Sequence, residues 1–160
     1  MTYLIVLGIY LAILFIVGFF SRRSMGFPSL ALAAGAVMAE LWTDSLTPIV
    51  AEAGIILVQP PLASLVSIAL TLIPAFIVMI RAPRVATHHH AWFGSLVFAV
   101  LGVVLTYGAF SNAVVLDEAS KDVVKQMIQY QPSITTSAIT LAIADVLFYK
   151  RPRSHDKSHR

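Results

Sequence analysis

The stretch YLIVLGIYLAILFIVGFF, Tyr3 to Phe20, decides the fold class, because it runs for eighteen residues without a charge. At 1.5 Å per residue a helix of this length covers about 27 Å, close to the ~30 Å hydrocarbon core of a bilayer. A backbone in lipid must satisfy its own hydrogen bonds, so we expect a transmembrane helix here. The sequence Ser21-Arg22-Arg23-Ser24 follows it instead of a small-residue cleavage site. We therefore expect a retained span rather than a signal peptide.

Two more runs of nineteen uncharged residues, Leu62–Ile80 and Trp92–Phe110, predict two further spans. The whole chain agrees with them: it is 58% hydrophobic and 12% charged, which is typical of a membrane protein rather than a soluble one. Its 160 residues allow one transmembrane helical domain, residues 1–149, followed by a basic cytoplasmic tail, residues 150–160. Cysteine is absent, which excludes disulfides, thiolate nucleophiles and cysteine-based metal sites.

Two weaker segments are predicted as additional spans. Residues 28–42 form a short helix that already contains Glu40, and we expect neighbouring helices to bury it. Residues 134–149 contain four Thr or Ser residues and Asp145. A helix lying along the membrane surface is the alternative for this last segment.

The distribution of Lys and Arg favours the fifth crossing. With the N-terminus outside and five crossings, the inside loops and tail hold nine basic residues and the outside loops hold two, Lys121 and Lys125. Positively charged short loops stay on the cytoplasmic side. We therefore expect an outside N-terminus and a cytoplasmic C-terminus.

Two amphipathic helices are predicted between the spans. The segment 43–61 has helically spaced apolar residues after Ser45 and is expected to lie on the outer membrane surface, with a re-entrant half-helix as the alternative. Residues 117–130 form the second amphipathic helix, and Gln131-Pro132-Ser133 is expected to break it. The fold class is thus all-α: a polytopic bundle of four to five transmembrane helices plus two interfacial helices.

Small residues recur at helical spacing and predict helix-packing faces. Such stripes let two helices approach closely in a membrane. The candidate contact residues are Ala31, Gly35, Ala39, Ser95, Ala99 and Gly102.

Glu40 and Asp145 are the candidates for an ion or proton path, since ionisable residues within membrane spans are often functional. The topology places them near opposite leaflets, so we do not expect a carboxylate pair. His88, His89 and His90 are consecutive, and helical neighbours point about 100° apart, which favours an interfacial polar turn over a metal site. No catalytic set or cofactor motif is visible, and we expect no enzyme activity, cofactor or metal.

The overall layout resembles the colicin V production protein family, often called CvpA-like. The first span ends in a basic, Gly-containing turn, Ser21-Arg22-Arg23-Ser24-Met25-Gly26-Phe27, and a Leu/Ala/Gly-rich short helix, Leu30 to Ala39, follows. An apolar span ending in Arg, a Gly-marked span at Trp92-Phe93-Gly94 and a Ser- and charge-bearing outer segment complete the pattern. The last helix and the basic tail depart from it. The resemblance implies a bacterial inner-membrane protein linked to toxin export and envelope maintenance, and it supplies no catalytic residues.

Two functions remain open from the sequence. The first is a non-enzymatic membrane scaffold or accessory subunit of an envelope or export process. Its partners would be the lipid bilayer, other membrane helices in a homo-oligomer or larger complex, and a periplasmic protein, with no nucleic acid. The second is a small oligomeric channel or ion-coupled transporter that uses Glu40 or Asp145.

Overall fold

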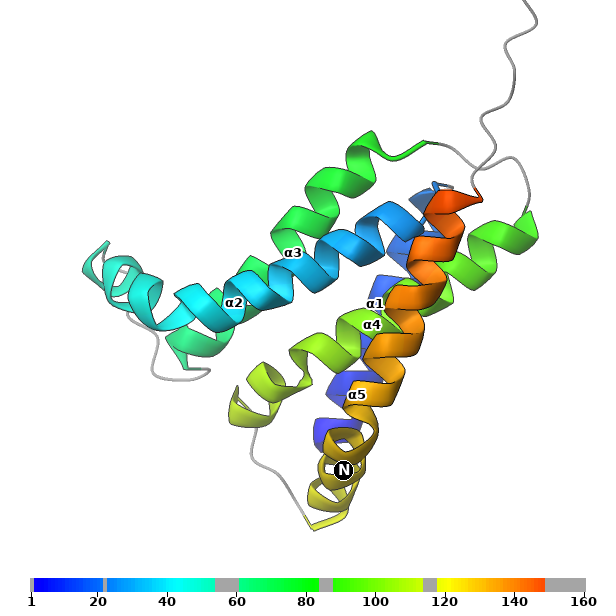
Figure 1. Cartoon of the computed structure of the whole chain (residues 1–160). Helices are drawn as coiled ribbons and strands as arrows, with labels where there is room; N and C mark the ends of the chain where they lie inside the picture. The colour runs from blue at the N-terminus through cyan, green and yellow to red at the C-terminus, as the bar shows by residue number, and fades with distance from the viewer. Residues whose placement is uncertain (1, 22, 54–60, 84–87, 114–117, 149–160) are drawn as a thin grey trace, which may run out of the picture.

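A computed structural model describes residues 2–21, 23–53, 61–83, 88–113 and 118–148. Within these ranges the chain forms five helices and no strand, which confirms the all-α prediction (Figure 1). The helices are α1 (Thr2–Ser21), α2 (Gly26–Glu52), α3 (Leu62–Arg81), α4 (His88–Ala113) and α5 (Glu118–Leu147). The basic tail and part of the segment 43–61 lie outside the described residues.

Three of the described helices are long and apolar enough to cross a membrane: Tyr3–Ser21, Leu62–Arg81 and Trp92–Asn112. The chain therefore belongs to the class of integral membrane proteins. This number is smaller than the predicted four to five, because α2 and α5 are more polar. Acidic residues interrupt α2, and a charged N-terminal part precedes the apolar part of α5.

The two amphipathic segments are not separate helices, and this part of the prediction is wrong. The described part of the first segment is the C-terminal part of α2, which continues through Pro48. The second segment is the N-terminal part of α5, which continues through Pro132 into the apolar part of the helix (Figure 1). A proline removes one helical hydrogen bond, but a long helix can kink there and continue. In α2 the hydroxyls of Thr43 and Thr47 also bond to the backbone oxygens of Ala39 and Thr43, on the turns before the proline.

Helix α4 lies at the centre of the bundle and contacts each of the other four helices. Helices α2 and α3 form an antiparallel hairpin with the most extensive contact in the fold, and α1 packs mainly on α4 (Figure 1). Helix α5 packs across α4 and α2. Both weakly apolar helices, α2 and α5, thus lie against other protein helices, as their composition favours.

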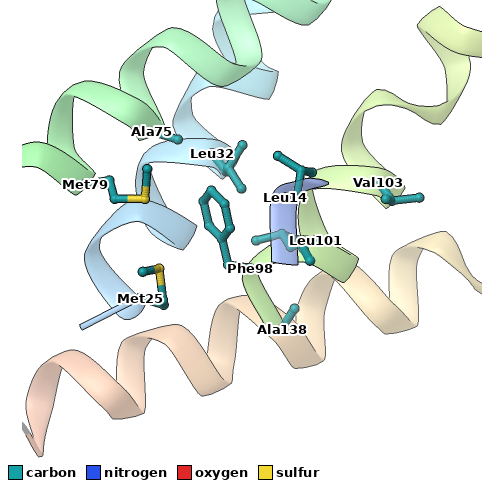
Figure 2. Close-up of a cluster of buried hydrophobic side chains, with 10 residues drawn as sticks. Leu14, Met25, Leu32, Ala75, Met79, Phe98, Leu101, Val103 and Ala138 are labelled. Carbon is teal, nitrogen blue, oxygen red and sulfur yellow. The ribbon is translucent and has the colours of Figure 1, made fainter. Parts of the chain in front are cut away.

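The apolar core brings together side chains from all five helices (Figure 2). Phe98 of α4 is fully buried and lies among Leu32, Met25 and Met79, while Ala138 of α5 approaches from the other side. This packed layer fixes the relative positions of the two polar regions described next.

Candidate functional site

Asp145, one of the two carboxylates predicted for an ion or proton path, caps the N-terminus of α2. Its Oδ2 accepts hydrogen bonds from Oγ of Ser24, at 2.8 Å, and from the backbone N of Gly26, at 3.0 Å. The first backbone N–H groups of a helix lack partners within the helix, and a negative charge is favourable there. Asp145 supplies both the acceptor and the charge, from a different helix.

Arg23 performs the complementary role at the C-terminus of α3. Its guanidinium donates to the backbone oxygen of Ile80 and, at 2.8 Å, to that of Ala82. The backbone N of Ser24 also donates to the oxygen of Pro83, at 2.9 Å. We call Arg23, Ser24, Gly26 and Asp145 the capping cluster. It joins the α1–α2 turn to the ends of α3 and α5.

Gly26 lets α5 approach the start of α2 closely. A Cβ atom at this position would lie 2.7 Å from Oδ2 of Asp145 and 2.8 Å from the backbone oxygen of Ala142. Any side chain here would push α5 away and separate Asp145 from its donors.

The predicted helix-packing residues pack mainly within the chain itself. A Cβ at Gly35 would lie 2.5 Å from the backbone oxygen of Thr71, so α2 and α3 touch there. Ser95 faces Gly18 across the α1–α4 contact, and Gly102 lies against Leu14. Ala39 and Ala99 are buried and Ala31 is half-buried. The faces formed by these residues are largely occupied in a single copy.

Glu40, the other carboxylate, lines a cavity of about 610 Å³ between α2, α3, α4 and α5. We call this cavity the vestibule. Asp44 lies one helical turn after Glu40 and lines it too, and both residues are exposed. On the opposite walls stand Ser64 and Ser67 of α3, Asn112 of α4, and Gln131 and Thr135 of α5.

Some of the polar atoms of the vestibule already have partners. The Thr71 hydroxyl donates to the backbone oxygen of Ser67, and Oε1 of Gln131 accepts from the Tyr107 hydroxyl. Oγ1 of Thr135, by contrast, is buried and has no hydrogen-bond partner. The vestibule therefore combines two exposed carboxylates with hydroxyl and amide side chains, while the hydroxyl oxygen of Thr135 is itself closed to solvent.

The two carboxylates predicted for an ion or proton path, Glu40 and Asp145, do not meet. Glu40 follows Gly26, the residue bonded to Asp145, by fourteen positions, which is about 21 Å along a helix. Leu32, Phe98 and Ala138 belong to the packed core shared by the helices that connect the two regions (Figure 2). Each carboxylate thus has its own surroundings.

The histidine run begins α4, but its side chains lie outside the described part of the structure. Among the residues that are described, no three His, Cys, Asp or Glu side chains come together as a metal site.

Most residues of both sites could not be predicted from the sequence. Asp44 had a readable signal, because it follows Glu40 by four residues and so shares its helix face. Ser24, Gly26, Gln131 and Thr135 had none, because their roles depend on how distant helices pack.

The chain matches no protein-family model, no curated protein and no solved structure. The resemblance to the colicin V production family thus stays a prediction.

Proposed function

We propose that this chain is a non-enzymatic integral membrane scaffold or accessory subunit of an envelope or export process. One observation carries the proposal: the two candidate carboxylates, Asp145 and Glu40, lie in separate surroundings. Asp145 is bonded in the capping cluster, and Glu40 lies in a vestibule some 14 residues away along α2. A single copy with this arrangement is suited to holding helices and partners rather than to conducting an ion.

The contacts with partners would use surfaces other than the small-residue faces, which the chain itself largely occupies. Many large apolar side chains remain exposed, such as Leu41, Ile77 and Leu147. In a membrane these face lipid or other helices. The scaffold proposal therefore predicts a stable complex that retains the fold of the single chain.

The proposal includes five crossings of a bacterial inner membrane with the N-terminus outside. Two groups of hydrogen bonds, at opposite ends of the bundle, support it. At one end Tyr3 donates to the backbone oxygen of Tyr107, whose own hydroxyl reaches Gln131. At the other end Asp145 bonds the turn that follows α1. Residues 131–145 of α5 thus extend between the same two levels of the bundle as α1.

Cysteine labelling tests this topology without background, because the chain has no cysteine of its own. We expect a membrane-impermeant maleimide to label Asp44→Cys in intact cells and Ser154→Cys only after permeabilisation. Labelling of both variants from the outside would exclude the fifth crossing.

The function itself is tested by isolating the protein in a mild detergent and measuring the mass and composition of the intact complex. A stoichiometric foreign partner supports the accessory role. Recovery of the pure monomer alone, from membranes in which the protein was not overexpressed, would contradict it.

The second candidate is an oligomeric channel or ion-coupled transporter, which the position of Glu40 on the vestibule wall favours. It predicts ion flux in liposomes that Glu40→Gln abolishes while the fold is kept. Equal flux in the wild type and in this variant would exclude Glu40 from the path.

A further inference from the structure

The vestibule begins at the end of the bundle opposite the capping cluster and extends inward between four helices. On α3 its lining runs from Ala63 to Thr71, which follows the first residue of the helix, Leu62, by nine positions, about 14 Å. On α4 the lining runs back from Asn112 to Leu105, about 10 Å. Both helices are long and apolar enough to cross a membrane, whose hydrocarbon core is ~30 Å thick. The vestibule therefore reaches about the middle of these two spans.

The lining of the vestibule changes from polar to apolar with depth. Side chains with carboxylate, hydroxyl or amide groups line the part near its open end: Asp44, Ser64, Asn112 and Gln131. Apolar side chains line its deep end: Ala33, Leu105 and Ile139. Beyond the deep end lies the apolar core, in which Leu32, Ala75 and Phe98 are fully buried (Figure 2). Within the described residues, the core thus closes the vestibule toward the capping cluster.

Ser64 indicates what fills this space. The residue lines the vestibule and is only 5% exposed. Its backbone N donates to the backbone oxygen of Pro61, but no described residue forms a hydrogen bond with its hydroxyl. Unlike the oxygen of Thr135, the hydroxyl oxygen of Ser64 is not closed to solvent. Buried polar groups are nearly always paired with protein or with water, and a lipid tail offers neither donor nor acceptor. Water is the partner that fits.

We propose that the vestibule is a water-filled inlet that opens at one face of the membrane and ends blind near its middle. At about 30 Å³ per molecule, its volume of about 610 Å³ holds on the order of 20 waters. Such an inlet lowers the cost of bringing a polar group of a partner or solute to the middle of the bilayer, because only the other half remains apolar. This inference goes beyond the scaffold role, because water enters the vestibule whatever partner the chain has.

Cysteine accessibility in lipid nanodiscs tests the inlet, since the chain has no cysteine of its own. The probe is a charged methanethiosulfonate, and its reaction is followed by the mass of the intact protein. Ser67→Cys places a thiol on the α3 wall of the vestibule. Leu65→Cys is the matched control, because Leu65 is exposed on the same helix, nearer its start, and lines an apolar groove instead. We expect Ser67→Cys to react at least about tenfold faster, because the thiolate is the reactive form and an apolar medium raises the pKa of a thiol.

A second pair tests the α2 wall. Ala36 lines the vestibule, whereas Met38 is exposed, does not line it and lies closer to its open end. Ala36→Cys should therefore react faster than Met38→Cys by a similar factor. In both pairs depth alone favours the control, so faster reaction of the deeper thiol requires water in the vestibule. Equal rates within either pair, or no reaction at the two wall positions, would overturn the proposal, because lipid would then fill the space.

Two further arms test the blind end and the location of the water. Ala75→Cys lies one turn deeper than Thr71 and should not react; a rate equal to that of Ser67→Cys would refute the blind end. Gly108 lines the vestibule, and a Cβ there meets no atom within 4 Å. Gly108→Phe should slow the reaction of Ser67→Cys by about tenfold, because the ring replaces water around the thiol. Gly8→Phe, in equally open space on the exposed side of α1, should leave the rate unchanged. An unchanged rate with Gly108→Phe would place the water outside the vestibule and refute the inlet.

Discussion

Replacing Asp145 by alanine is expected to destabilise the fold rather than to remove an activity. The carboxylate accepts two hydrogen bonds, from Ser24 and from the backbone of Gly26, and it caps α2. Loss of a helix N-cap costs about 1 kcal/mol, and a hydrogen bond to a charged group contributes about 1.5–3 kcal/mol. Because Asp145 is only partly buried, we expect a loss of about 2–4 kcal/mol for Asp145→Ala. Asp145→Asn keeps one acceptor oxygen and should lose about 1 kcal/mol.

The assay is reversible unfolding of the purified protein in mixed micelles, followed by circular dichroism. Asp122→Ala is the matched control, because Asp122 is an exposed aspartate on the same helix. A double-mutant cycle with Ser24→Ala should give a coupling energy of about 1 kcal/mol. The reasoning fails if Asp145→Ala unfolds within about 0.5 kcal/mol of Asp122→Ala, which is the range of ordinary surface changes.

The same unfolding assay checks four further changes. Gly35→Leu should destabilise the protein by more than about 3 kcal/mol, since its Cβ would strike the backbone of α3, whereas Gly8→Leu has open space and should be neutral. Gly102→Leu meets only the movable end of a leucine and should lose about 1–3 kcal/mol; a loss as large as that of Gly35→Leu would contradict this ranking. Arg23→Met should lose about 1–3 kcal/mol by freeing two carbonyl groups at the end of α3, and wild-type stability would refute that role. Ser29→Ala should be neutral or stabilising by up to about 1 kcal/mol, because the buried hydroxyl of Ser29 has no partner, and a marked loss would reveal one.

The helices that could be predicted from the sequence are those whose apolar runs are sufficient on their own. Tyr3–Phe20, Leu62–Ile80 and Trp92–Phe110 differ from α1, α3 and α4 only at their ends. Each run is long enough to cross a bilayer without help from its neighbours, so local composition determines it.

The errors concern α2 and α5, where local signals and tertiary contacts disagree. Pro48 and Pro132 are typical helix breakers, but both helices continue through them. Packing against α3 and α4 can compensate for one lost hydrogen bond. A proline read in isolation gives no information about that packing.

The candidate sites were still less predictable. Glu40 and Asp145 were identified by type and position, because a carboxylate in an apolar segment is conspicuous. Their surroundings depend on residues far away in the sequence: Asp145 contacts residues 119 and 121 positions before it. No periodicity or motif encodes such a distance.

This separation in sequence affects the order in which contacts form while the chain is synthesised. A chain made at about 5–20 residues per second needs about 6–24 s to go from Gly26 to Asp145. During that interval α2 has been synthesised while its first backbone N–H group lacks its acceptor. Of the five described helices, the last to be synthesised therefore completes the first turn of α2. The hydrogen bonds at the start of α2 can therefore form only after α5 has been made, so a late segment of the chain stabilises an early one.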